Sequence, residues 1–341
     1  MGLHHNLFFR TKGISRGIYL LALVLAITGC QQKSQEAKGS VAEITLAYPL
    51  STSGVLTHIA LKNGYFAEAG LKVTAQIKTT GKAALDDLLE GKADFATAAD
   101  TPIMFAITNG KKIYLIAEIQ TSTQDEGIVA RRDLGIIKPS DLKGKKIGVT
   151  LGTAADFFMD SFFLMHGINR QEVKIIDVNP EEMLEALRHG RVDAVSIWNP
   201  LLKQLQKELG DKGVVFLEED ISTTLFCFVV TYEFAKQNPK VIKKVLKALI
   251  KAEEFVMQHP EEAKKVIAEA TQTEPAIIDD IWDGLTFKVT LDQSLLTSLE
   301  DQTRWAQKYG LTKGIEIHNY LDFIYFDGLQ AVRPETVRII R

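Results

Sequence analysis

The chain has 341 residues, of which 46% are hydrophobic, and its formal net charge at pH 7 is −3. This apolar content is ordinary for a globular protein, and the length suits two domains better than one. A mildly acidic chain lacks the basic surface that binds nucleic acid, so the composition argues against a nucleic-acid partner.

The first thirty residues have the pattern of an export signal. Three basic residues precede an apolar run from Ile18 to Ile27, and no acidic residue occurs before Glu36. The run is too short to cross a bilayer, which needs about 20 residues. The Ile-Thr-Gly-Cys sequence that ends at Cys30 resembles the bacterial lipobox, in which the cysteine is lipidated and becomes the mature N-terminus. We therefore expect residues 1–29 to be a lipoprotein signal peptide; the alternative is an ordinary secretory signal with a chance Gly-Cys.

Residues 30–42 are mostly polar and lack periodicity, which predicts a flexible tether between a lipid at Cys30 and the fold. Without residues 1–29 the chain keeps 37 of its 40 basic residues against 43 acidic ones, so the exported protein is more acidic. Cys227 is then the other cysteine, and a lone thiol in an apolar run is expected to be buried. We expect a lipid-anchored protein on the periplasmic or cell-surface side of a bacterial membrane.

From residue 43 the chain alternates strand-like and helix-like segments. Strands are predicted over 43–49, 72–79 and 94–99, and helices over about 54–63 and 82–90. Strands that alternate with helices of this length predict an α/β protein with a mostly parallel, doubly wound sheet.

The same pattern recurs about one hundred residues later. LLEGKADFATA (Leu88–Ala98) is echoed by LRHGRVDAVSI (Leu187–Ile197), with a glycine and an aspartate at matching places. Upstream, the strand and turn of 44–52 are mirrored by 147–153. We infer two similar α/β lobes.

An apolar strand is predicted over 225–231, and a long helical region begins near Pro239. We expect the chain to return to the first lobe there. Lobe I would then be discontinuous, and lobe II would be inserted in it. The expected boundaries are 43–132 plus 225–341 for lobe I and 133–224 for lobe II.

Polar turns follow several of the predicted strands. In an open parallel sheet, ligands bind outside the carboxyl ends of the strands, where helix N-termini attract small anions. Helix capping explains each turn taken singly, but five turns from two lobes favour a ligand-binding cleft. The turns are 48–54, 98–102, 120–123, 151–156 and 198–200.

Two residues in these turns have open interpretations. Trp198 could cover a ligand with its ring or pack in the core. Asp100 could cap its helix or meet a cationic group on the ligand.

Motifs of catalysis are missing from the sequence. It contains no HExxH, no GxSxG, no phosphate-binding P-loop and no GxGxxG. The histidines after Cys30 have no metal-ligand spacing and are interpreted as lone surface or helix-end residues. Cys227 lies in an apolar run, a poor environment for a reactive thiolate. We expect no enzyme, no catalytic residue, no metal and no cofactor.

Four segments carry a resemblance to a known family: GKADFATAADTPIMFA (Gly91–Ala106), EGIVARRD (Glu126–Asp133), SDLKGKKIGVTLGTAADFF (Ser140–Phe158) and DQSLLTSLEDQTRWA (Asp292–Ala306). They resemble the solute-binding proteins of ABC importers for nitrate, aliphatic sulfonates and taurine, which share a fold with thiamine-pyrimidine synthases. The resemblance implies a two-lobed periplasmic-binding-protein fold (type II-like), with doubly wound sheets joined by a hinge. It also implies a monomer that closes on a small ligand and delivers it to a membrane permease and its ATPase.

Carried over by position, the resemblance implies these ligand-binding residues: Tyr48, Ser51, Thr52, Ser53, Asp100, Thr101, Thr121, Ser122, Gly152, Thr153, Ala154, Trp198 and Asn199. The turns considered contain no cationic side chain, so an anion would depend on backbone N–H groups and hydroxyls. Asp100 would favour a ligand with an amine or a ring N–H, such as taurine or a pyrimidine, over nitrate.

Two alternatives remain open from the sequence. One is a thiamine-pyrimidine-synthase-like enzyme, although those enzymes depend on a cysteine-rich iron-binding motif and only Cys227 is present here. The other is a ligand-sensing lobe that acts on a separate membrane kinase.

Overall fold

The computed structural model describes residues 41–218, 221–312 and 318–341. The expected signal peptide, Cys30 and residues 30–40 of the tether lie outside the described residues. Among the helices that the structure describes, none combines the length and the apolar character needed to cross a membrane.

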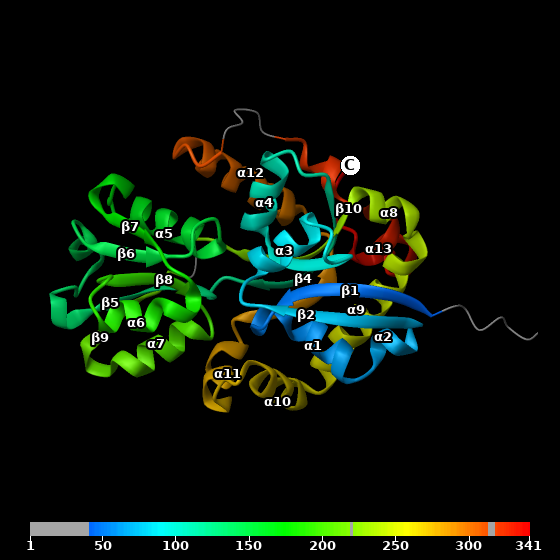
Figure 1. The fold of residues 1–341 in the computed structure, drawn as a ribbon, viewed down its shortest axis with the longest axis horizontal. Coiled ribbons are helices and arrows are strands. Elements are labelled where there is room, and N and C mark those ends of the chain that lie inside the picture. The colour runs from blue at the N-terminus through cyan, green and yellow to red at the C-terminus, as the bar shows by residue number, and fades with distance from the viewer. Residues whose placement is uncertain (1–40, 219–220, 313–317) are drawn as a thin grey trace, which may run out of the picture. The chain divides into compact units, whose positions relative to one another are not determined.

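The first sheet has six strands and draws on both ends of the chain (Figure 1). Its order is β11-β4-β10-β3-β1-β2. β1 is parallel to β2 and β3, whereas β10 runs antiparallel between β3 and β4, so the returning chain completes the sheet. The strands are β1 (Ala42–Pro49), β2 (Leu71–Lys78), β3 (Phe95–Ala99), β4 (Ile113–Ser122), β10 (Thr224–Thr231) and β11 (Leu285–Thr290).

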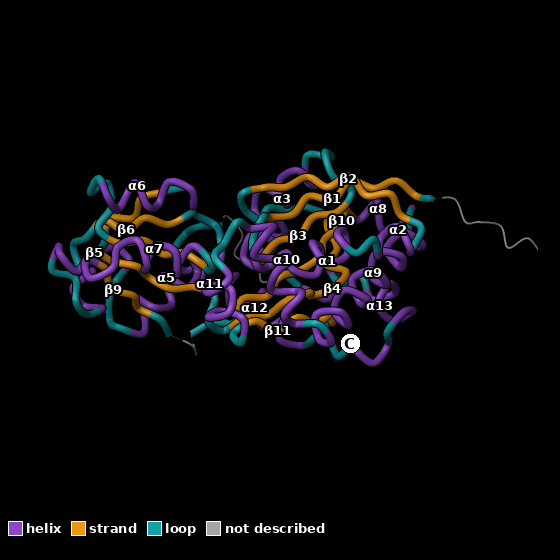
Figure 2. Tube along the Cα trace, turned by 90° about the horizontal axis from the view of Figure 1, so that it is seen from below, coloured by secondary structure: helices purple, strands orange, loops and turns teal. Residues whose placement is uncertain are grey.

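The second sheet has five strands in the order β7-β6-β8-β5-β9, and Figure 2 shows it as a separate group of strands. β6 is parallel to β7 and β8, and β5 is antiparallel to β8 and β9. The strands are β5 (Glu126–Arg131), β6 (Lys146–Val149), β7 (Lys174–Asp177), β8 (Ala194–Trp198) and β9 (Gly213–Phe216).

The helices connect the strands and cover the sheets. Those that follow strands of the first sheet or come after β10 are α1 (Val55–Lys62), α2 (Tyr65–Glu68), α3 (Gly81–Leu89), α4 (Asp100–Thr108), α8 (Tyr232–Gln237), α9 (Pro239–Gln258), α10 (Pro260–Thr271), α11 (Pro275–Trp282), α12 (Gln293–Lys308) and α13 (Phe326–Val332). Those between strands of the second sheet are α5 (Ala154–Met165), α6 (Met183–Arg188) and α7 (Leu201–Leu209). The predicted α/β alternation is confirmed.

Helices cover both faces of the second sheet. Successive side chains of a strand point to opposite faces, and β5 follows this rule. Ile128 and Ala130 pack with α5 in one buried cluster, whereas Val129 packs with α6 and α7 in another. This is the doubly wound arrangement that the sequence predicts.

The internal echo has a structural cause. Asp94, just before β3, accepts a hydrogen bond from the backbone N–H of Thr45 in β1 at 2.7 Å. Asp193, just before β8, accepts the equivalent bond from the N–H of Lys146 in β6 at 2.8 Å. In each case the aspartate N–H also donates to the carbonyl of the same partner residue. The repeated aspartate therefore pins one parallel strand to its neighbour in both sheets.

The point at which the chain enters the second sheet differs from the expectation. β5 pairs with β8 and β9, although the expected boundary left residues up to 132 in the first lobe. The apolar run of β5 suits either sheet, so its own residues do not reveal which sheet it joins. The chain returns with β10, which begins at Thr224.

Candidate functional site

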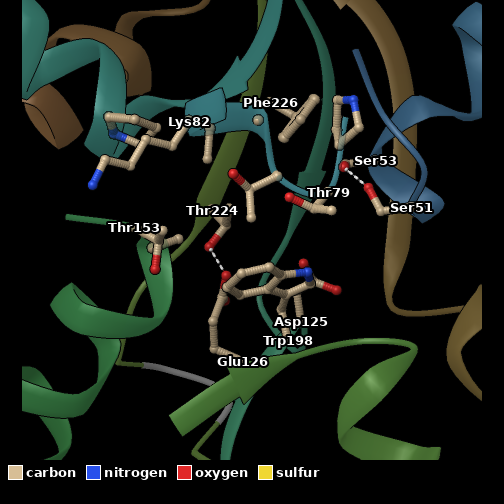
Figure 3. Close-up of a pocket in the computed structure, with 16 residues that line it drawn as sticks. Ser51, Ser53, Thr79, Lys82, Asp125, Glu126, Thr153, Trp198, Thr224 and Phe226 are labelled. Carbon is tan, nitrogen blue, oxygen red and sulfur yellow. Dashed lines mark hydrogen bonds between the residues drawn. The ribbon is translucent and has the colours of Figure 1, made fainter. Parts of the chain in front are cut away.

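A pocket lies where turns of both sheets meet (Figure 3). The first sheet contributes the carboxyl ends of β1, β2 and β3 and the start of β10. The second contributes the start of β5, the end of β8 and the turn after β6. The lining residues are Pro49, Ser51, Ser53, Thr79, Thr80, Gly81, Lys82, Ala99, Pro102, Asp125, Glu126, Thr153, Ala154, Trp198, Thr224 and Phe226.

Two helices begin at the pocket wall. Thr80 caps α3, because its hydroxyl accepts a hydrogen bond from the Ala83 N–H at 3.0 Å. Thr153 precedes α5, but its hydroxyl donates to the Thr150 carbonyl at 2.7 Å and does not cap the helix. The first N–H groups of a helix have no partner within the helix and carry partial positive charge. Both helix starts can therefore bind an anionic group.

Gly81 allows the α3 turn to approach the sheet. A Cβ at this position would lie 2.9 Å from Ala98 Cα and 3.2 Å from the Phe226 ring. The backbone of β3 cannot move away cheaply, so a larger residue would push the start of α3 out of place.

Two adjacent carboxyl groups, Asp125 and Glu126, also line the pocket. Both are buried, with 7% and 5% of their surface exposed. The Thr224 hydroxyl donates to Glu126 Oε1 at 2.8 Å, whereas Asp125 Oδ1 has no hydrogen-bond partner among the described residues. Burial raises the pKa of Asp125 to about 7. Burial, followed by the neighbouring Asp125 charge, raises the pKa of Glu126 well above its usual range.

A cation also lines the pocket, which corrects the expectation that none would be present. Lys82 lies in the first turn of α3 and lines the pocket across from Trp198 (Figure 3). Its ammonium donates to the Leu151 carbonyl at 3.0 Å, a contact from α3 to the turn after β6. The turn between β2 and α3, which leads to Lys82, was not among the turns expected to bind the ligand.

Five of the expected site residues line the pocket: Ser51, Ser53, Thr153, Ala154 and Trp198. Ser51 and Ser53 also share a hydrogen bond between their hydroxyls. The other expected residues are not among those that line it: Tyr48, Thr52, Asp100, Thr101, Thr121, Ser122, Gly152 and Asn199.

Asp100 is the clearest of these differences. It is fully buried, and its carboxylate accepts hydrogen bonds from Ser298 Oγ at 2.6 Å and Gln302 Nε2 at 2.7 Å, both on α12. The Thr101 N–H donates to its other oxygen at 3.1 Å. Burial raises its pKa to about 6 although these bonds lower it. Asp100 thus joins α4 to α12.

The remaining expected residues have other surroundings. The Tyr48 ring packs edge-on against His58, with 5.0 Å between ring centroids. Ser122 Oγ donates to the Gly284 carbonyl at 2.8 Å, and Asn199 Nδ2 donates to the Gln124 carbonyl at 3.1 Å. Gly152 borders a neighbouring groove. The other members of this group pair within the sheet or are buried: Thr121, Thr52 and Thr101.

Sequence reasoning did not name eleven of the sixteen residues that line the pocket, and two signals could have found part of them. The Thr-Thr-Gly-Lys run after β2 is a polar turn that opens a helix, as the other candidate turns are. Asp125 and Glu126 lie at the start of β5, and the candidate turn 120–123 ends two residues before Asp125. The lining residues that were missed are Pro49, Thr79, Thr80, Gly81, Lys82, Ala99, Pro102, Asp125, Glu126, Thr224 and Phe226.

Cys227 and His58 lie in surroundings that do not favour catalysis. Cys227 is fully buried in β10, as expected, and burial raises the pKa of its thiol well above the usual value. His58 is buried and not at the surface, which corrects the expectation, and burial lowers its pKa to about 4. Within the described ranges, no cluster of three or more His, Cys, Asp or Glu side chains could hold a metal ion.

Comparison with known sequences finds a family model and several relatives that match this chain. A model of the family described as NMT1/THI5 like matches residues 54–263. The "Putative aliphatic sulfonates-binding protein" of Bacillus subtilis (strain 168) is 28% identical over 241 residues, which are 69% of this chain and 72% of that protein. The "Taurine-binding periplasmic protein" of Escherichia coli (strain K12) is 25% identical over 215 residues, 62% of this chain and 65% of that one. The match thus spans less than two thirds of the Escherichia coli relative.

Solved structures share the fold. The alkanesulfonate-binding protein SsuA from Xanthomonas axonopodis pv. citri, bound to MOPS, superposes with a TM-score of 0.75 and 18% identity, over 84% of this chain and 99% of that one. The periplasmic nitrate-binding protein NrtA from Synechocystis PCC 6803 gives a TM-score of 0.69 and 17% identity, over 86% and 89%. The periplasmic-binding-protein fold expected from the sequence is confirmed.

Proposed function

This chain belongs to the NMT1/THI5-like family, and we propose that it is the extracytoplasmic solute-binding component of an ABC importer. It captures a small ligand in the pocket between the two sheets and delivers it to a permease and its ATPase. The names of its relatives, which describe sulfonate, taurine and nitrate binding, support a role in binding rather than in catalysis.

One observation carries this proposal: the pocket is lined by turns of both sheets, at the edge where ligands bind α/β proteins. Such a pocket exists only while the two sheets are held together. A ligand inside it contacts both and stabilises their approach.

The pocket suits a ligand with a compact anionic group. The α3 and α5 helix starts supply N–H groups, and the Ser51, Ser53 and Thr79 hydroxyls supply further hydrogen bonds. Sulfonates such as taurine, nitrate-like anions and thiamine-pyrimidine-like rings are the ligand classes to test.

Binding then works as a population shift. Moving a two-state hinge from mostly open to mostly closed needs about 5.5 kcal/mol of differential binding. The second sheet offers Thr153, Trp198, Asp125 and Glu126 to the ligand. A few hydrogen bonds to these groups, at about 0.5–1.5 kcal/mol each, supply a large part of that energy.

The proposal includes the attachment to the membrane. Diacylation of Cys30 anchors a chain stably, since one acyl chain gives only marginal membrane binding. Mass spectrometry of the N-terminal peptide from the producing cell tests it: an acylated Cys30 supports the anchor, and an unmodified N-terminus at another residue removes it.

Calorimetry and thermal-shift measurements on the full chain in mild detergent test the ligand. The panel holds aliphatic sulfonates, taurine, nitrate and thiamine pyrimidines. A ligand at a hundred times its dissociation constant adds about 2.7 kcal/mol of stability. A hit that is lost in Trp198→Ala supports the proposal. If a sample that unfolds cooperatively shows neither a heat of binding nor a thermal shift with any ligand of the panel, the proposal is contradicted.

A further inference from the structure

We propose that Asp125 and Glu126 form an acidic subsite that binds a cationic nitrogen group of the ligand, so that the solute is zwitterionic. The anionic end of the solute lies at the α3 and α5 helix starts. This inference rests on the proposed solute-binding function and narrows its substrate class.

Asp125 supplies the main contact. Its carboxylate is 93% buried on the pocket wall, yet Oδ1 lacks a hydrogen-bond partner among the residues that the structure describes. A buried acceptor without a partner is costly, because it has lost its hydration and gained nothing in return. A ligand N–H group that enters the pocket satisfies it.

Glu126 supplies the second carboxylate of the subsite, and Thr224 holds it in place. Thr224 Oγ1 donates to Glu126 Oε1 at 2.8 Å, and this bond joins the start of β10 in the first sheet to the start of β5 in the second. Two adjacent buried carboxyl groups repel one another when both are ionised. A cation between them removes that repulsion, and no basic side chain lies within salt-bridge distance of either group among the described residues.

Trp198 provides an aromatic surface beside the two acids. Figure 3 shows its ring next to the Asp125 and Glu126 side chains within the pocket. An alkylammonium group is attracted to the face of an indole ring. The ring and the carboxylates together therefore select a cationic group over a neutral one of the same size.

The opposite wall has the opposite polarity. Lys82 lies there, together with the start of α3, and both carry positive charge or partial positive charge. A ligand that is only anionic gains from this wall but is repelled by the acidic pair. A zwitterion gains from both walls.

Isothermal titration calorimetry near neutral pH tests the inference on the full chain in mild detergent. The ligands are taurine, its hydroxyl analogue isethionate and ethanesulfonate, which share the sulfonate and the two-carbon chain; 3-aminopropanesulfonate and propanesulfonate form a longer matched set. We expect the aminated member of at least one set to bind tenfold or more tightly than its partners. We expect Asp125→Asn to abolish that preference while sulfonates without an amine bind equally well or better.

Asp211→Asn is the matched control, since it removes the same charge from an exposed position after α7. It is expected to leave the preference unchanged. Equal binding of aminated and non-aminated sulfonates overturns the acidic subsite and leaves the importer function standing. An undiminished preference in Asp125→Asn also overturns it. Failure of every sulfonate, nitrate and pyrimidine to bind overturns both proposals.

Discussion

Trp305 of α12 donates a hydrogen bond from its indole nitrogen to Asp160 Oδ2 of α5 at 2.8 Å. α12 packs on the first sheet's α4, whereas α5 packs on the second sheet, so this bond connects the two. Arg170 forms an ion pair with the same Asp160 oxygen and also lies over the Tyr309 ring at 5.7 Å. These residues form a joint between the sheets outside the ligand pocket.

We expect Trp305→Phe to loosen this joint. The ring packing is largely kept, but the hydrogen bond to a charged acceptor is lost, and such bonds contribute about 1.5–3 kcal/mol. If the joint favours the closed arrangement, the ligand dissociation constant rises by up to about tenfold, because less protein is competent to bind. Small-angle scattering should show a larger radius of gyration without ligand. Trp282→Phe, whose ring packs on Phe287 in the first sheet, is the control. An unchanged affinity and radius would contradict this role.

Trp198→Ala should weaken ligand binding by tenfold or more and should also lower the melting temperature of the empty protein. The ring is only partly buried at the end of β8 and faces the pocket. The ring also packs against both buried clusters of the second sheet, so its removal takes away core packing as well as ligand contact. Calorimetry and thermal unfolding of the same sample separate the two effects. A dissociation constant equal to that of the wild type would remove Trp198 from the site.

Gly81→Ala should lower both stability and affinity. The added methyl group meets the β3 backbone at 2.9 Å, and such overpacking costs about 1–3 kcal/mol. The shift displaces the start of α3, which carries Thr80 and Lys82. Gly91→Ala is the comparison: its positive φ of 75° is also unfavourable for alanine, but nothing lies within 4 Å of the added atom. Denaturant unfolding and calorimetry should find stability reduced in both variants and affinity reduced only at position 81. Equal affinity in the two would show that the α3 start does not contact the ligand.

The acidic pair should make stability depend on pH. Burial raises the pKa of Asp125 from 3.8 to about 7, so the folded state holds this proton more tightly than the unfolded state. Its contribution to stability is therefore fully present below about pH 4 and is lost as the pH rises towards 7. Asp125→Asn cannot ionise, so its stability relative to the wild type should increase as the pH rises over this window.

Thermal unfolding of the wild type and Asp125→Asn without ligand, at pH 5 and pH 8, measures this difference. Asp100, Glu118 and Asp160 have pKa values raised in the same sense, but they are present in both proteins and cancel in the comparison. Asp211→Asn should follow the wild type. Parallel pH profiles of the wild type and Asp125→Asn would refute the linkage.

The local elements of this protein can be predicted from its sequence. The alternation of apolar and polar residues predicts β2 and α3 within one residue of their observed ends, because side-chain periodicity depends on neighbours along the chain. The echo of Asp94 in Asp193 marks a strand pairing that occurs in both sheets. Trp198 could be placed at the site because it ends a strand in a polar turn.

Which polar groups face the ligand pocket depends on how distant segments pack together. The sequence suggests that Asp100 is free to contact a ligand from its turn. In the structure, Ser298 and Gln302, about two hundred positions away, donate hydrogen bonds to its carboxylate. Asp125 and Glu126 lie just beyond the candidate turn 120–123, and the return of β10 and the end of β8 make them a pocket wall. The burial and hydrogen bonding of a side chain depend on segments that are close in space but distant in sequence. The local sequence pattern therefore does not reveal them. The physical character of this pocket, anionic on one side and cationic on the other, therefore comes from packing between distant parts of the chain.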